Sequence, residues 1–116
     1  MTLTRGSIYM ANMPIIESSS VQGGFRPVLV VQNDIGNAHS PTVQVVPLTS
    51  RCKHELPVHT KITGCGLDKE SIVLTEQMQT IDKTALHKRI GQVDDVTMER
   101  INMCILIQLG ILHIAN

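Results

Sequence analysis

Short runs of β-branched and other apolar residues, each closed by turn-forming residues, constrain the fold of this chain most. The run PVLVV at 27–31 is the clearest, because a continuous apolar run of this length is typical of a strand buried on both faces. Comparable runs predict strands at 6–13, 42–50, 58–62, 71–81 and 90–93, with one or two helical turns at 82–89. Pro47 lies inside one of these runs and predicts a bulge or an exposed edge there.

The hydrophobic period changes after Asp94, which predicts a C-terminal helix capped by Asp94 or Asp95. Its apolar positions include Met98, Ile101, Ile105, Leu109 and Leu112, and its second half adds Met103, Cys104, Leu106 and Ile107. A helix that is apolar on most of its circumference is usually buried on more than one side. A dimer interface and a plug at the end of a barrel both explain this pattern.

These elements predict a mainly β (α+β) fold, a small and strongly curved barrel or half-barrel with a C-terminal helix. A length of 116 residues suits a single domain over 1–116. The ten basic and ten acidic residues cancel, which disfavours a general coat for polyanions. Up to Gly66, five basic residues face three acidic ones, so a local anion site in the N-terminal part is allowed.

Three features indicate a cytoplasmic protein. The three cysteines are odd in number and form no CxxC pair. The N-terminus MTLTRGSIYM lacks the apolar region of a signal peptide, and the stretch 101–114 is too short and interrupted to span a bilayer. One Tyr, one Phe and no Trp also argue against an RNA-recognition surface of several stacked rings.

The segment VQGGFRP places a permanent cation, Arg26, between a Gly-Gly pair and a strand. The glycines permit close backbone approach, and Pro27 favours an extended conformation at Arg26. A guanidinium held in this way suits a phosphate or a carboxylate, on which its planar fork makes two aligned hydrogen bonds. The alternative is a solvated loop arginine paired with Glu17 or Asp34.

A second candidate site is the strand exit PLTSRCK at 47–53. Its hydroxyls and cations, Thr49, Ser50, Arg51 and Lys53, suit phosphate contacts, although a polar strand exit with solvated basic residues is common.

Two further combinations are weaker. Cys52, His54, His59 and Cys65 supply four possible zinc ligands, but their spacing matches no usual finger or ribbon, so we expect no metal site. The five histidines include enough residues for an acid–base pair that cleaves RNA, but their spacing selects no two of them.

Several motifs occur together in a specific order: RGxIY, QGGxRPVLVxQND, NxxSPT, a Thr-Ser strand exit and EQxxTID. With them, the chain resembles the MazF/PemK family of toxin endoribonucleases from about Arg5 to the C-terminal helix. The resemblance implies an SH3-like barrel of the CcdB/MazF type and a homodimer. It also implies cleavage of single-stranded RNA without metal or other cofactor, leaving 2′,3′-cyclic phosphate and 5′-hydroxyl ends. A cognate antitoxin would block the cleft with an acidic segment.

The resemblance assigns the catalytic roles to Arg26 and Thr49. We expect RNA contacts from backbone groups and mostly small polar side chains, namely Gln22, Gly24, Phe25, Asn33, Ser50, Arg51 and Gln77. The general base is open between His59, Glu76 and water. Val21 stands where many relatives have an acidic residue. The alternative function is a CcdB-like toxin that binds gyrase and has no ribonuclease activity.

Overall fold

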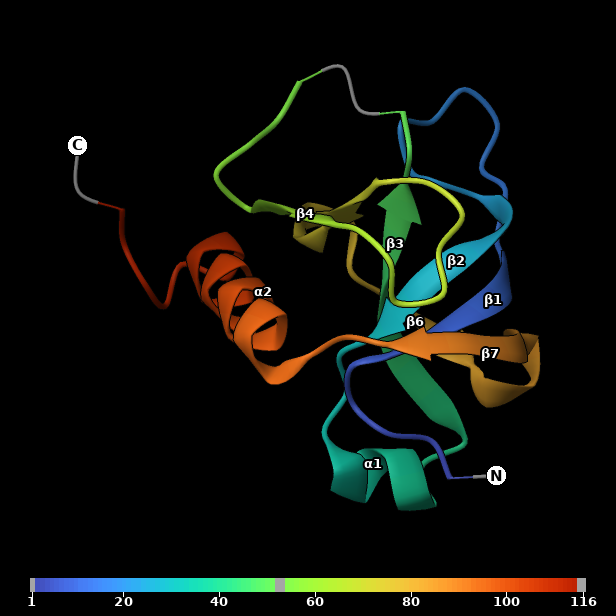
Figure 1. The fold of residues 1–116 in the computed structure, drawn as a ribbon. Helices are drawn as coiled ribbons and strands as arrows, with labels where there is room; N and C mark the ends of the chain where they lie inside the picture. The colour runs from blue at the N-terminus through green and yellow to red at the C-terminus, as the bar shows by residue number, and fades with distance from the viewer. Residues whose placement is uncertain (1, 52–53, 115–116) are drawn as a thin grey trace.

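The computed structural model describes residues 2–51 and 54–114 (Figure 1). The elements in chain order are β1 (Ser7–Met13), β2 (Gly24–Val30), α1 (Asp34–His39), β3 (Thr42–Thr49), β4 (His59–Ile62), β5 (Ser71–Leu74), η1 (Thr75–Gln77), β6 (Gln79–Asp82), η2 (Lys83–Ala85), β7 (Leu86–Gln92) and α2 (Asp95–Gln108). The mainly β architecture with a C-terminal helix is therefore confirmed. In the described ranges, no helix is both long and apolar enough to cross a membrane.

The strands form one antiparallel sheet in the order β4-β5-β3-β2-β1-β7, and β6 also pairs with β3. Strand β3 holds the sheet together because it pairs with three others. Its first half, 42–45, pairs with β6, and its end, 48–49, pairs with β5. Pro47 lies opposite Val28 of β2. On its other edge, β3 pairs with β6 up to residue 45 and with β5 from residue 48, so Pro47 lies between these two ladders. A residue without an N–H is tolerated where a ladder is interrupted.

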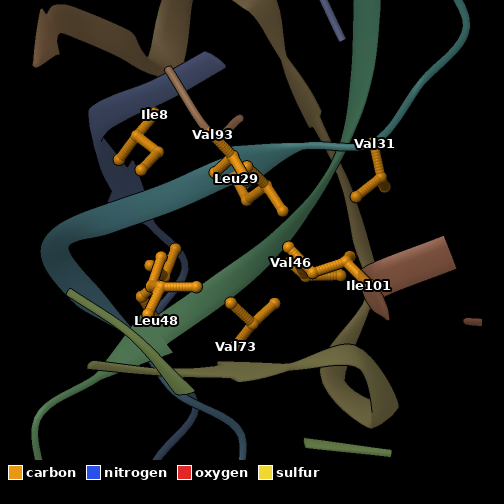
Figure 2. Packing of buried hydrophobic residues seen from close by; sticks show 9 residues of the cluster. Ile8, Leu29, Val31, Val46, Leu48, Val73, Val93 and Ile101 are labelled. Atoms are coloured by element: carbon orange, nitrogen blue, oxygen red, sulfur yellow. The ribbon is translucent and has the colours of Figure 1, made fainter. Parts of the chain in front are cut away.

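Two apolar clusters lie on opposite faces of the central strands. Alternation along β2 sends Leu29 to one cluster and Val28 and Val30 to the other, and all three side chains are fully buried. The predicted burial of both faces of PVLVV is thereby confirmed. Figure 2 shows the first cluster, in which residues of β1, β2, β3 and β5 surround Leu29 and meet Ile101 of α2.

Helix α2 both closes this first cluster and exposes apolar surface. Asp94 is the N-cap, as predicted, and accepts a hydrogen bond from the Thr97 N–H at 2.7 Å. Ile101 is fully buried, whereas Met103 and Leu109 are 48% and 59% exposed. The predicted helix is too long, because the chain leaves it after Gln108. Gly110 adopts φ +74°, and the N–H groups of the next two residues, 111–112, turn back to the Leu106 carbonyl.

Two other predicted elements differ from the structure, and one short helix was not predicted. The expected strand 71–81 is broken by η1, where the buried Thr75 hydroxyl donates to the Val58 carbonyl at 2.6 Å instead of continuing the ladder. The expected helical turns at 82–89 reduce to η2, and β7 covers the second half of that range because it pairs with β1. The turn-rich segment after Gln32 contains the short helix α1, which the Asn33 side chain caps.

Candidate nucleic-acid cleft

Arg26 and Thr49 lie at the same end of two neighbouring strands. In the register of β2 and β3, Val28 is opposite Pro47 and Leu29 is opposite Val46. Continuing this register outward by two residues places Arg26 opposite Thr49. Arg26 thus belongs to strand β2 itself, which begins at Gly24, two residues earlier than Arg26.

Backbone carbonyls hold the Arg26 guanidinium. Its Nε donates to the Gly23 carbonyl at 2.9 Å, and Nη1 lies 3.5 Å from the Leu48 carbonyl. Gly24, with φ +85°, supplies the backbone turn that brings the Gly23 carbonyl into place. The Arg26 side chain is therefore oriented by one carbonyl just before β2 and by one carbonyl of β3.

Within the described part of the chain, Arg26 forms no ion pair, so the alternative of a pair with Glu17 or Asp34 is wrong. Asp34 instead accepts a hydrogen bond from the Arg5 N–H at 2.7 Å. Partial burial lowers the pKa of the Arg26 guanidinium below its ordinary value, because desolvation disfavours the charged form. An anion that enters beside this group meets an uncompensated cation in a partly desolvated site.

An open cleft of about 660 Å³ lies at this end of the strands. It is lined by Met10, Arg26, Pro27, Leu48, Thr49, Ser50, Arg51, Gly66, Leu67, Asp68, Lys69, Ser71 and Ile90. Four of the predicted site residues, Arg26, Thr49, Ser50 and Arg51, are therefore brought together. Lys53 and Cys52 lie outside the described residues.

The Thr49 hydroxyl is held by the strand exit that follows it. Its Oγ1 accepts from the Arg51 N–H at 3.1 Å and lies 3.4 Å from the Arg51 carbonyl, the geometry of a short side-chain turn. Thr49 is half-buried, and Ser50 and Arg51 are exposed. The hydroxyl is thus fixed in position at the cleft while the basic side chain remains available.

The wall formed by residues 66–69 was missed by sequence reasoning. A Cβ at Gly66 would lie 1.7 Å from the Ile90 carbonyl oxygen, and one at Gly91 would lie 1.6 Å from the Cys65 carbonyl oxygen. The β4–β5 loop and β7 therefore approach backbone to backbone, which only glycine permits. This contact places Asp68 and Lys69 at the cleft. The Gly64-Cys65-Gly66 segment signals a turn, but not its partner strand.

The other predicted RNA contacts do not line this cleft. The Gln22 N–H donates to Gln77 Oε1 at 2.7 Å, and Gln77 Nε2 donates to the Ser20 carbonyl at 3.2 Å, which ties the β1–β2 loop to η1. The exposed Val21 lies in the same loop. Asn33 is committed elsewhere: its Oδ1 accepts from the Gly36 N–H at 2.9 Å as the cap of α1.

Phe25 points to the opposite face of β2 from Arg26, next to the cleft. It is 59% exposed and meets the ring of His87 edge to face, with ring centroids 5.3 Å apart.

His59 and Glu76, two of the candidate bases, form a pair away from the cleft lining. His59 Nε2 lies 2.8 Å from Glu76 Oε2, and His59 Nδ1 accepts from the Leu56 N–H at 3.0 Å. This pair joins β4 to η1. Among residues 2–51 and 54–114, no group of three or more His, Cys, Asp or Glu side chains is placed to hold a metal ion.

Residues 4–109 match the family of PemK-like, MazF-like toxins of type II toxin–antitoxin systems. The chain belongs to this family. It is 40% identical over 112 residues to the endoribonuclease MazF of Staphylococcus saprophyticus, covering 94% of this chain and 92% of that one. It is also 40% identical over 116 residues to the endoribonuclease EndoA of Bacillus subtilis, covering 97% and 98% of the two chains.

The fold leads to the same family. A solved endoribonuclease in complex with its cognate antitoxin, from a mycobacterial species, superimposes with a TM-score of 0.73 at 26% identity and 94% coverage of both chains. The match to PemK/MazF toxins confirms the resemblance and does not favour the gyrase-binding alternative. The cleft at Arg26 and Thr49 is therefore the candidate functional site of a family member.

Proposed function

We propose that this protein is a sequence-specific toxin endoribonuclease that cleaves single-stranded RNA without a metal ion. The observation that carries the proposal is the position of Arg26 and Thr49 side by side at an open cleft, with the guanidinium oriented by backbone carbonyls. The two relatives at 40% identity, both named endoribonucleases, support the reaction type.

In the proposed reaction the 2′-oxygen attacks the adjacent phosphorus, and the bond from phosphorus to the 5′-oxygen breaks. The products are a 2′,3′-cyclic phosphate and a 5′-hydroxyl. Negative charge builds on the non-bridging oxygens, where the N–H groups of Arg26 donate hydrogen bonds. Thr49 donates a further hydrogen bond or aligns the 2′-hydroxyl.

The proton on the 2′-hydroxyl must leave and the 5′-oxygen must gain one. A guanidinium that keeps its proton serves as the electrostatic stabiliser and not as the general base. Since His59 and Glu76 do not line the cleft, water is the base that best fits the described geometry. The N–H groups of Arg26 donate hydrogen bonds to the developing charge without releasing the proton, and the leaving 5′-oxygen takes its proton from water.

Substrate contacts divide into two groups. Ser50 and Arg51 line the cleft and are placed to contact phosphates beside the scissile one. Gln22, Gly24, Phe25 and Gln77 belong to the start of β2 and to the loop and η1 beside it, where they would contact flanking nucleotides. The Asn33 side chain caps α1 and is therefore not among the proposed RNA contacts.

We also propose that the protein forms a homodimer and is inhibited by a cognate antitoxin. Apolar side chains of α2 and of the segment after it are exposed, which suits a second copy of the chain. Arg26, Arg51 and Lys69 outnumber Asp68 at the cleft, which suits an acidic inhibitory segment. The mycobacterial relative was solved in complex with its cognate antitoxin.

The reaction is tested by incubating the purified protein with RNA in the presence of EDTA. We expect cleavage to persist, and sequencing of the 5′-hydroxyl ends to reveal the preferred sequence. A 2′-deoxy nucleotide at the cut site should abolish cleavage, because the nucleophile is then missing. Intact RNA together with inhibited gyrase supercoiling would contradict the ribonuclease and support the gyrase-binding function.

A further inference from the structure

The exposed aromatic pair of Phe25 and His87 lies next to the cleft. Phe25 is the only phenylalanine of the chain, and the only tyrosine, Tyr9, is 1% exposed. Phe25 by contrast is 59% exposed and meets His87 at an interplanar angle of 82°. A chain this poor in aromatic residues therefore places one of its two aromatic rings at the surface and supports it with a histidine.

The aromatic pair lies beyond the lining of the cleft, on the face of β1 and β2 that carries Met10 and Pro27. In the register of β1 and β2, Met10 is opposite Pro27, and Asn12 is opposite Phe25. Met10 and Pro27 line the cleft. Because side chains alternate along a strand, Asn12 and Phe25 lie on the same face as these two residues, one repeat of about 7 Å further out. This displacement is about one nucleotide step along an extended strand.

The histidine ring is held in its orientation. Asn12 Nδ2 lies 2.9 Å from His87 Nε2, and since the amide nitrogen donates, Nε2 accepts. The His87 ring is thus fixed by β1, and the two rings are brought together by strands β2 and β7, which both pair with β1. An edge-to-face contact supports the Phe25 ring without covering both of its faces.

We propose that Phe25 and His87 together form a stacking support for one unpaired base of single-stranded RNA, one nucleotide away from the scissile phosphate at Arg26. Asn12 acts as a positioning residue that holds the His87 ring. The inference rests on the proposed ribonuclease function and adds His87 and Asn12 to the substrate contacts. Base stacking on aromatic side chains needs no particular base, so this support contributes to binding affinity more than to sequence discrimination.

The test measures binding of an oligonucleotide that contains the preferred cleavage sequence with a 2′-deoxy nucleotide at the cut site. We expect Phe25→Ala and His87→Leu each to raise the Kd about tenfold, the usual range for loss of a stacking ring. His87→Tyr keeps a ring and should stay within about twofold of the wild type. His39→Leu changes an exposed histidine at the end of α1 and serves as the matched control, with unchanged Kd.

A second binding experiment identifies which base of the RNA stacks on Phe25. The Kd of the wild-type protein is measured for a series of oligonucleotides, each of which has one abasic site at a different position. One position next to the cut site should lose affinity, and that same oligonucleotide should show no additional loss with Phe25→Ala, because the two changes remove the same contact. Asn12→Ala should raise KM with kcat nearly unchanged, as expected for an interaction present equally in ground and transition states.

The outcomes are distinguishable. If the wild type neither binds nor cuts RNA, the ribonuclease proposal fails and this inference fails with it. If the wild type binds normally but Phe25→Ala and His87→Leu do as well, only the stacking support is overturned. Losses that are equal at every abasic position, or that affect only antitoxin binding, overturn it too.

Discussion

At the residue scale, Arg26 combines two properties that are seldom found together. It has no carboxylate partner within the described chain, and its orientation is nevertheless set by the Gly23 and Leu48 carbonyls. A solvated arginine samples many rotamers and loses that freedom on binding. Here the freedom is already restricted before substrate arrives, which is the condition for efficient transition-state stabilisation.

We expect Arg26→Ala to lower kcat by about 10² to 10³, since removal of one well-placed donor has this effect in comparable sites. Arg26→Lys should restore little, because an ammonium lacks the planar fork. The measurement is single-turnover cleavage of an oligoribonucleotide by protein whose fold is verified by circular dichroism. Wild-type rates in a folded Arg26→Ala protein would remove this residue from the mechanism.

Thr49 is expected to act through its hydroxyl. Thr49→Val keeps the β-branched shape and should lower kcat by about 10² or more, whereas Thr49→Ser should retain much of the activity. Thr84→Val, an exposed threonine in η2 away from the cleft, is the matched control. Equal activity of the Val and Ser variants at position 49 would contradict a catalytic hydroxyl.

At the element scale, the contact between the β4–β5 loop and β7 decides the shape of the cleft. Gly91→Ala would bring a methyl group into the Cys65 carbonyl, so the loop must move away. We expect a loss of about 1–3 kcal/mol in the free energy of unfolding, typical of overpacking, together with reduced cleavage.

Urea unfolding measures the stability of Gly91→Ala. Gly36→Ala is the control, since the nearest atoms to a Cβ there belong to the Gln32 side chain, at 3.0–3.1 Å, and not to the backbone. If both variants unfold at the same urea concentration as the wild type, the close approach of loop and strand has no energetic importance.

The start of α2 gives a pH-dependent contribution to stability. The hydrogen bond from the Thr97 N–H holds the pKa of Asp94 below its ordinary value of 3.8. A depressed carboxyl pKa stabilises the fold at pH values above the ordinary pKa, and this stabilisation is lost as the pH falls through the folded-state value. We therefore expect the urea midpoint to fall on acidification below about pH 4.

Asp94→Asn isolates this effect, because asparagine caps helices about as well but does not titrate. The variant should show a smaller loss of stability between pH 6 and pH 3 than the wild type. Asp34, whose pKa is lowered first by the Arg5 N–H and then by the Asn37 amide, also contributes to the acid-induced loss and remains in both proteins. An identical pH profile for the two proteins would show that the Asp94 cap has no charge component.

At the scale of the whole molecule, α2 presents one face to the first apolar cluster and another face to solvent. Ile101 is fully buried in that cluster, with Met98 and Ile105 packed against it. Met103, Leu109 and Ile111 are each about half exposed or more. The prediction that the helix plugs the barrel therefore describes the face with Ile101, and the exposed face is the one that we propose for a dimer interface.

We expect the 12.8 kDa chain to behave in solution as a dimer of twice that mass, measured by light scattering after gel filtration. Leu109→Glu places a charge on the exposed apolar face and should shift the equilibrium towards monomer. Val96→Glu, also exposed but at the start of the helix, is the control. A monomeric wild type would overturn the proposed dimer.

The sequence by itself determined the central strands, the start of α2 and the position of Arg26 beside a glycine pair, because local periodicity and capping report directly on which residues are buried. It also predicted Thr49, Ser50 and Arg51 as a cluster. Only the tertiary structure decided that Gly66 meets Gly91, that His87 meets Phe25 sixty-two residues away, and that η1 interrupts the strand 71–81. These contacts depend on strand order and register, which pair residues far apart in the chain and leave no periodic trace in either segment.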